Sequence, residues 1–155
     1  MSIAIDASAP ADHPGMPRLW ERSARASHHF LGEDDIAEIR SEVMAAFEAA
    51  AFIGLALRVA RNEEGCVAGF AGTMDGKLEM LFIDPASRGR GWGRALLVHA
   101  VDALSASRVD VNEDNPEALA FYRAWVSRCA AARRGMAPAG RFRCCSWRGV
   151  RVERT

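Results

Sequence analysis

The sequence predicts an α/β (α+β) fold, in which helices flank a central sheet that has both parallel and antiparallel strands. Two tight turns, at residues 62–65 and at Asp75-Gly76, join three apolar runs into an antiparallel meander. A strand–helix–strand unit follows, and such a unit implies a right-handed crossover between parallel strands. The chain has 155 residues, half of them apolar, which suits a single domain, residues 1–155, with one substantial core.

The N-terminal third predicts one strand and two helices. Residues 2–6 alternate in polarity and suit a short first strand. Asp12 can cap a first helix, which an apolar stripe continues to Leu31 and which Gly32 ends. A second helix is predicted by apolar residues at helical spacing: Ile36, Ile39, Val43 and Phe47.

The middle of the chain predicts the meander and the crossover unit. Apolar runs indicate strands at 55–60, 66–72 and 78–83, a helix at 91–107 and a further strand at 108–112. Pro116 suits the first position of the last helix, because proline there loses no helical hydrogen bond.

A glycine-rich turn after the strand at 78–83 predicts an anion site. Three glycines alternate here with three arginines: Arg88, Gly89, Arg90, Gly91, Gly93 and Arg94. Glycine permits positive φ and a close approach of the backbone. The first turn of the following helix points unpaired N–H groups and a partial positive charge at the turn. The natural guest of this cradle, residues 88–94, is a phosphate or pyrophosphate.

Two motifs resemble the GNAT superfamily of N-acetyltransferases. The pattern Arg-x-x-Gly-x-Gly at 88–93 resembles the coenzyme A pyrophosphate loop of that family, and Asn-x-x-Ala-x-x-Phe-Tyr at 115–122 resembles the helix that follows. The resemblance covers residues 78–124. It implies the GNAT fold, with a mixed sheet of about five to seven strands flanked by about four helices. It also implies a small bacterial enzyme whose acetyl donor is acetyl-CoA.

The resemblance implies how acetyl-CoA is held. N–H groups of the cradle would bind the pyrophosphate, and those of the preceding strand would contact pantetheine and stabilise the developing oxyanion. Asn115 would contact the cofactor or only cap its helix. The cofactor-binding residues expected are Leu81, Phe82, Ile83, Arg88, Gly89, Arg90, Gly91, Trp92, Gly93, Arg94 and Asn115.

The resemblance also implies catalytic roles. Tyr122 would be the general acid, because a phenol with a pKa of about 10 is protonated at neutral pH. Glu79 would be the base, acting through water. The alternatives are a core aromatic for Tyr122 and an exposed strand carboxylate for Glu79. Candidates for the acceptor pocket are His28, His29, Asn112 and Glu113.

The C-terminal tail departs from the family. Residues 1–125 carry a net charge of −7, whereas residues 126–155 carry +7 and show little alternation. Family members continue with Gly-Phe and two long strands, so we expect defective closing strands here. Read from the third base of each codon, residues 125–129 can encode Gly-Phe-Glu-Val. Out-of-frame translation from about residue 125 is one hypothesis, and a diverged basic tail is the alternative.

These observations predict an acetyl-CoA-dependent N-acetyltransferase, which passes the acetyl group to a primary amine of a small molecule or protein by direct attack in a ternary complex. The alternative is a catalytically impaired coenzyme A-binding protein with a truncated acceptor site. A nucleic-acid partner, which the basic tail would serve, is not expected.

The remaining expectations concern location, metals and assembly. The sequence has no apolar run long enough to span a membrane and no signal peptide, so we expect a cytoplasmic protein. The four cysteines lack zinc-ligand spacing, so no metal is expected. A broken closing strand would expose a sheet edge and invite a homodimer.

Overall fold

The computed structural model describes residues 3–27, 31–112, 115–128, 131–136, 143–148 and 150–152. Seven strands form one mixed sheet in the order β1-β2-β3-β4-β5-β8-β7, and β6 pairs with β9 in a small second sheet. The strands are β1 (Ala4–Ala7), β2 (Ala56–Arg61), β3 (Val67–Met74), β4 (Lys77–Ile83), β5 (Arg108–Asn112), β6 (Val126–Arg128), β7 (Ala131–Met136), β8 (Arg143–Arg148) and β9 (Arg151–Val152). The helices are α1 (Met16–Ser27), α2 (Glu33–Ile53), α3 (Trp92–Leu104) and α4 (Pro116–Trp125), with short 3-10 helices η1 (Pro10–Gly15) and η2 (Pro85–Ser87).

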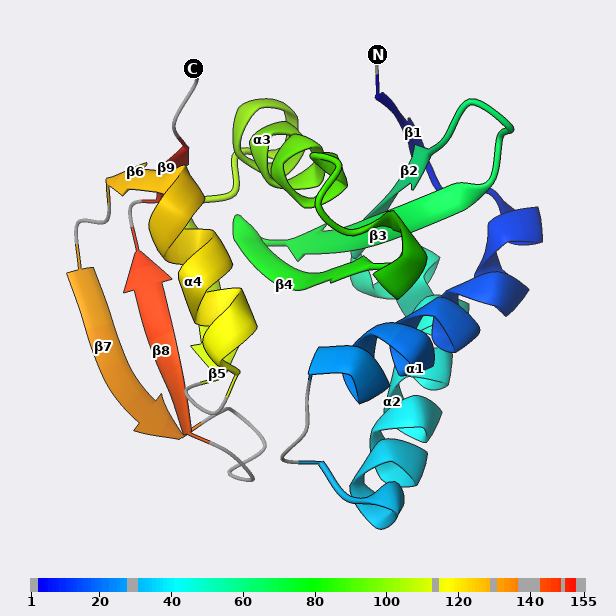
Figure 1. Ribbon diagram of the computed structural model, residues 1–155, viewed down its shortest axis with the longest axis horizontal. Helices are drawn as coiled ribbons and strands as arrows, with labels where there is room; N and C mark the ends of the chain where they lie inside the picture. The colour runs from blue at the N-terminus through cyan, green and yellow to red at the C-terminus, as the bar shows by residue number, and fades with distance from the viewer. Residues whose placement is uncertain are drawn as a thin grey trace.

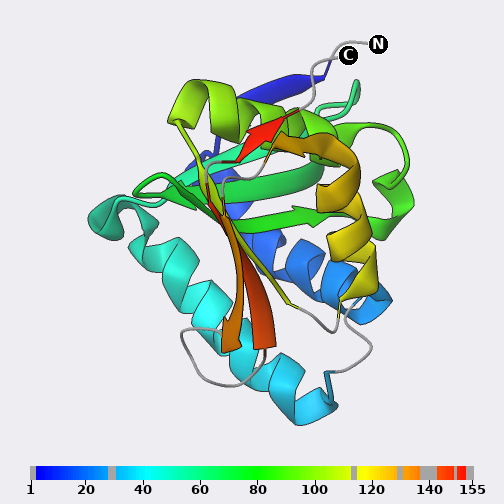
Figure 2. The ribbon, with the colours of Figure 1, turned by 90° about the vertical axis from the view of Figure 1, so that its left-hand side faces the viewer.

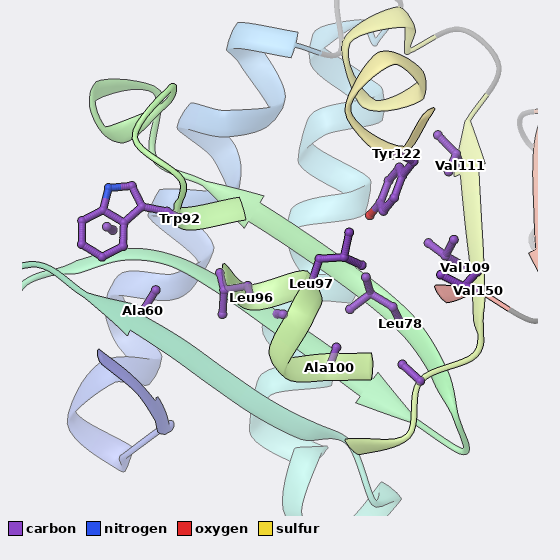
Figure 3. Close-up of a cluster of buried hydrophobic side chains, with 13 residues drawn as sticks. Ala60, Leu78, Trp92, Leu96, Leu97, Ala100, Val109, Val111, Tyr122 and Val150 are labelled. Carbon is purple, nitrogen blue, oxygen red and sulfur yellow. The ribbon is translucent and has the colours of Figure 1, made fainter. Parts of the chain in front are cut away.

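Helices cover both faces of the sheet (Figure 1). On one face α1 and α2 bury a cluster around Trp20, Phe47 and Phe70, whose aromatic rings exclude water from β2 and β3. On the other face α3 packs Leu96 and Leu97 against the strands, beside residues from β5 and α4 (Figure 3). The predicted mixed sheet with four flanking α-helices is therefore confirmed among the described residues.

The two predicted turns of the meander are confirmed by their backbone conformations. Asp75 and Gly76 both have positive φ, 51° and 74°, as a two-residue hairpin with the twist of its strands requires. Gly65, at the end of the first turn, has a φ of 82°. These turns fix the register of β2, β3 and β4.

The sheet opens between β4 and β5, which form the one parallel pair among the described strands. Pairing is confined to Lys77 with Arg108 and Leu78 with Val109. On its other side β4 carries a β-bulge at Glu79, because Thr73 pairs with Leu78 and Gly72 with Met80. A bulge bends a strand and increases its twist. β4 and β5 therefore part just beyond Leu78.

An ion-pair cluster holds the closed end of this opening. The Lys77 ammonium lies 2.7 Å from Asp110 on β5 and 3.6 Å from Glu79. Burial would favour the neutral amine, but the hydrogen bond to Asp110 and the charge of Glu79 raise the pKa of Lys77. The cluster thus keeps a protonated lysine between two carboxylates where the strands begin to diverge.

The first helix differs from its prediction. α1 begins only at Met16, after η1, and Asp12 lies in η1, where its carboxylate accepts the Ala9 N–H. Gly32 begins α2 instead of ending the first helix, since its carbonyl accepts the Ile36 N–H at 3.0 Å. The acidic residues after Gly32 favour this start, because carboxylates stabilise a helix N-terminus.

The closing strands also differ from their prediction. β8 pairs antiparallel with every residue of β5, and β7 pairs with β8 (Figure 2). The weak side-chain alternation misled the prediction, because the ladder is made by main-chain groups, and neither strand contains a proline that would remove a donor.

None of the helices in the described ranges has the length and apolar character needed to cross a membrane.

Candidate active site

A cavity of about 420 Å³ lies where β4 and β5 part. Its floor is the end of β4, residues 81–83, and its rim is the cradle. The inward face of α4 forms one wall, and the C-terminal half of α1, through Ser23 and Ser27, forms another. Three parts of the chain that are distant in sequence therefore meet at one site: α1, the segment from β4 to the cradle, and α4.

The cradle has the conformation that its glycines predict. Gly89 and Gly91 have φ values of 74° and 88°, in the left-handed region that glycine adopts readily. The Gly91 carbonyl accepts the N–H of Ala95 at 3.0 Å, which is the first hydrogen bond of α3. The N–H groups of residues 92–94 consequently have no acceptor within the helix. Such N–H groups and the helix dipole are the features that favour an anion at a helix N-terminus, and here they lie on the cavity rim.

The arginines of the cradle contact the cavity walls. Arg88 donates through Nη2 to the Ser23 carbonyl and hydroxyl oxygens, at 3.2 and 3.3 Å, and its Nη1 lies 3.3 Å from the Glu117 carboxylate. The Arg94 guanidinium lies 4.9 Å from the ring centroid of Trp125 at the end of α4, a cation–π contact. The two arginines thus tie α1 and α4 to the cradle.

The ladder between β3 and β4 fixes where the main chain of the floor points. The Asp84 N–H donates to the Ala68 carbonyl at 2.8 Å, and bonded pairs alternate along an antiparallel ladder. Phe82, two residues earlier, therefore directs its N–H to β3. The N–H groups of Leu81 and Ile83 point to the opposite side, where β5 has parted from β4. Of the three N–H groups expected to contact the cofactor, those of Leu81 and Ile83 therefore face the opening and that of Phe82 does not.

Tyr122 reaches from α4 into the boundary between the cavity and the core. Its side chain is buried, among the cluster that includes Val109 and Val111 on β5 (Figure 3). Burial raises the pKa of Tyr122 above its ordinary value, because the phenolate is poorly solvated there. The hydroxyl is therefore held protonated, as a proton donor needs to be.

Comparison with known proteins identifies the family. Residues 27–125 match the model of the acetyltransferase (GNAT) domain. The chain is 33% identical over 123 residues to the peptidyl-lysine N-acetyltransferase YjaB of Escherichia coli K12, a match that covers 79% of this chain and 80% of the relative.

The chain belongs to the GNAT family of acetyltransferases.

Solved structures agree with this assignment. The solution structure of apo-form YjaB from Escherichia coli has a TM-score of 0.77 at 28% identity and covers 96% of this chain and 98% of that one. PaiA N-acetyltransferase from Thermoplasma acidophilum, solved in complex with coenzyme A, has a TM-score of 0.69 at 15% identity, with 96% and 99% covered, and shows the shared fold.

Membership of the GNAT family confirms the expected chemistry in outline. The chain is an N-acetyltransferase, and its acetyl donor is acetyl-CoA. The cavity fits that donor, because the N-terminus of α3 at the rim suits a diphosphate and an apolar floor suits an uncharged arm.

The structure brings most of the predicted site residues together. Tyr122, the expected general acid, lines the cavity. So do ten of the expected cofactor-binding residues: Leu81, Phe82, Ile83, Arg88, Gly89, Gly91, Trp92, Gly93, Arg94 and Asn115. Arg90 is exposed on the cradle and is not among the lining residues. Asn115 is buried and accepts the Ala118 N–H at 3.1 Å, so it is at least the cap of α4.

The predicted base and acceptor residues are less well placed. Glu79 lies outside the cavity wall, at the bulge of β4 and beside Lys77. Asn112 ends β5, but its side chain is outside the described part of the structure. His28, His29 and Glu113 lie outside the described residues altogether.

Sequence reasoning missed seven residues of the cavity wall: Ser23, Ser27, Ser87, Glu117, Ala118, Phe121 and Trp125. Ser23 and Ser27 are four residues apart on the buried stripe of α1, where a purely apolar stripe was expected. Glu117, Phe121 and Trp125 recur every fourth residue on α4, which is the spacing of one helix face. That periodicity was readable, but which face meets the cradle was not.

Proposed function

We propose that this GNAT enzyme transfers the acetyl group of acetyl-CoA to the side-chain amine of lysine in a protein. The observation that carries the proposal is the cavity itself, which is lined by the cradle, by Leu81 and Ile83 on its floor, and by the buried Tyr122. The acceptor class is supported by the relative named a peptidyl-lysine N-acetyltransferase. The net charge of −7 over residues 1–125 supports it too, since it attracts cationic acceptors.

The cradle and the floor would bind and orient acetyl-CoA. N–H groups of residues 92–94 hold the diphosphate at the N-terminus of α3. The N–H groups of Leu81 and Ile83 face the opening and donate to the thioester oxygen as it gains negative charge. Because these donors belong to a strand and a helix end, they need little reorganisation during the reaction.

The transfer needs one bond made and one broken in the ternary complex. The amine nitrogen bonds to the carbonyl carbon as the carbon–sulfur bond breaks. The acetyl group thereby becomes part of an amide, and the thiolate of coenzyme A departs. Tyr122 gives its hydroxyl proton to the departing sulfur, for which its raised pKa keeps it protonated. Glu79, at the bulge, accepts the proton of the attacking amine through water, because it stands outside the cavity wall.

The same proposal covers the organisation of the chain. We take residues 1–155 as a single N-acetyltransferase domain, with 126–155 as its atypical tail. The pairing of β8 with β5, and of β7 with β8, argues against a truncated acceptor site. The reading-frame hypothesis for the tail and the homodimer remain predictions.

Release of free thiol from acetyl-CoA, measured with a panel of acceptors, tests the proposal. A lysine-containing peptide with a blocked N-terminus should give thiol release and an acetylated lysine by mass spectrometry. A matched peptide with arginine in place of lysine should give neither. Activity only with a free peptide N-terminus or with small amines would reject the lysine acceptor, and no activity with any amine would favour the impaired enzyme.

A further inference from the structure

Glu117 is a carboxylate in the wall of a cavity that is otherwise built to receive an anion. It follows Pro116 at the start of α4, and its side chain is 57% exposed. Its Oε2 lies 3.3 Å from Nη1 of Arg88, and both residues line the cavity. An incoming diphosphate therefore meets one negative charge and one cation that is already engaged.

Arg88 is anchored on its other edge. Its Nη2 donates to the carbonyl and the hydroxyl of Ser23 on α1, and Ser23 is buried. A guanidinium is a rigid planar fork, so contacts on one edge fix the direction of the other. With the contacts to Ser23 kept, Nη1 can exchange Glu117 for another acceptor that approaches from the same side. Arg88 is therefore held at the cradle by Ser23, and Glu117 is the partner that it can exchange.

We propose that Glu117 is an internal competitor for Arg88: it occupies the edge of the guanidinium that the diphosphate of acetyl-CoA takes, and it thereby limits the affinity for the cofactor. This inference rests on the proposed function of the cavity. The diphosphate wins the exchange because it carries more negative charge than a carboxylate and also reaches the helix N–H groups. Binding then removes one of the ties between α4 and the cradle.

The proposal predicts that a loss of charge strengthens binding. Glu117→Gln keeps the shape of the side chain and releases Arg88. Because the pair is partly exposed, we expect the dissociation constant for acetyl-CoA to fall by only about threefold at low salt. The gain should shrink as salt screens the pair. Inorganic pyrophosphate should show the same gain, whereas S-acetylpantetheine, which has no phosphate, should bind both proteins equally.

A matched control separates the local effect from net charge. Glu33 pairs with Arg25 at 2.6 Å and does not line the cavity. Glu33→Gln removes the same charge and the same kind of ion pair. It should therefore leave the dissociation constants for acetyl-CoA and for inorganic pyrophosphate unchanged. An equal gain in Glu33→Gln would overturn the inference.

A double-mutant cycle tests whether Arg88 carries the effect. In an Arg88→Gln background, or Arg88→Met if the first variant does not fold, Glu117→Gln should give no further gain. A gain that persists without Arg88 rejects the exchange, as does unchanged or weaker binding by Glu117→Gln alone. If the unaltered protein fails to bind acetyl-CoA, the proposed function falls together with this inference, whereas binding that ignores Glu117 rejects the inference only.

Discussion

The ring of Phe121 on α4 lies so close to Gly93 on α3 that a Cβ atom on Gly93 would stand 3.2 Å from Phe121 Cε2. A Cβ there would also be 3.6 Å from Ile83 on the cavity floor. Glycine within a helix costs stability relative to alanine, so the close approach gives a physical reason for it at this position. α4 therefore rests directly on the cradle, and both Phe121 and Gly93 line the cavity.

Enlarging Gly93 should therefore displace α4 and weaken cofactor binding. For Gly93→Leu we expect affinity for acetyl-CoA to fall by about tenfold or more, equivalent to about 1.4 kcal/mol or more. Gly15→Leu is the matched control, because a Cβ at Gly15 meets no atom within 4 Å. Calorimetric titration of both variants measures the difference. Equal affinities would show that α4 does not bound the cofactor site.

Tyr122→Phe tests the general acid. Loss of the hydroxyl should lower kcat by about 10²-fold, the usual size of an acid contribution, with little change in KM. The ring remains in the core, so the variant should still unfold cooperatively. A kcat within a few-fold of the unaltered enzyme would leave Tyr122 as a core aromatic.

The pH dependence follows from the same residue. Burial raises the pKa of Tyr122, so the folded protein keeps the proton while the unfolded chain ionises near pH 10. The neutral tyrosine thus contributes stability fully below about pH 10, and this is lost as the pH rises further. A profile of kcat against pH should show no alkaline loss due to Tyr122 below about pH 10. A fall in kcat that begins below about pH 10 and that disappears in Tyr122→Phe would contradict this assignment.

Asp12 should make folding sensitive to acid. Hydrogen bonds from Arg61 at 2.8 and 2.9 Å, assisted by the Ala9 N–H, lower the pKa of Asp12 despite its partial burial. A lowered folded pKa contributes stability above the unfolded value of about 4 and loses it as the pH falls through the folded one. Asp12→Asn should cost roughly 0.5–1 kcal/mol at pH 7 and much less at pH 3. Urea unfolding at both values checks this, and an equal cost at both would refute it.

Asn115 allows its two roles to be separated. Asn115→Ala removes the acceptor of the Ala118 N–H and should destabilise the protein by about 1 kcal/mol. Asn115→Ser keeps a capping oxygen and should restore most of that stability. If Asn115→Ser binds acetyl-CoA as the unaltered protein does, Asn115 is only a cap. We expect weaker binding, because the residue lines the cavity.

Local signals predicted the fold where the decisive contacts are local. The Asp75-Gly76 turn, the glycines of the cradle and the Asn115-Pro116 cap each act within a few residues, and each stands as expected. The same logic failed for Asp12, whose main partner Arg61 is 49 residues away. A helix cap and a distant ion pair draw on the same residue types, and only the fold decides between them.

The site was predictable as a set of motifs but not as a set of contacts. The sequence places Arg88 in a phosphate loop, yet nothing local reveals that Ser23 and Glu117 hold its two edges. The bulge at Glu79 depends on the register of β3 against β4, and that carboxylate lies outside the cavity wall. Long-range pairing therefore decides the part of the site that sequence patterns leave open.

The most direct test of the account is calorimetric titration of acetyl-CoA into the unaltered chain and into Gly91→Val. Gly91 has a φ of 88°, and a β-branched residue there should distort the cradle, at a cost of about 1–2 kcal/mol. We predict one acetyl-CoA bound per unaltered chain and affinity at least about tenfold lower in the variant, with cooperative unfolding retained. Equal binding by the two proteins, or no binding by the folded unaltered chain, would contradict the claim that residues 88–94 hold the cofactor.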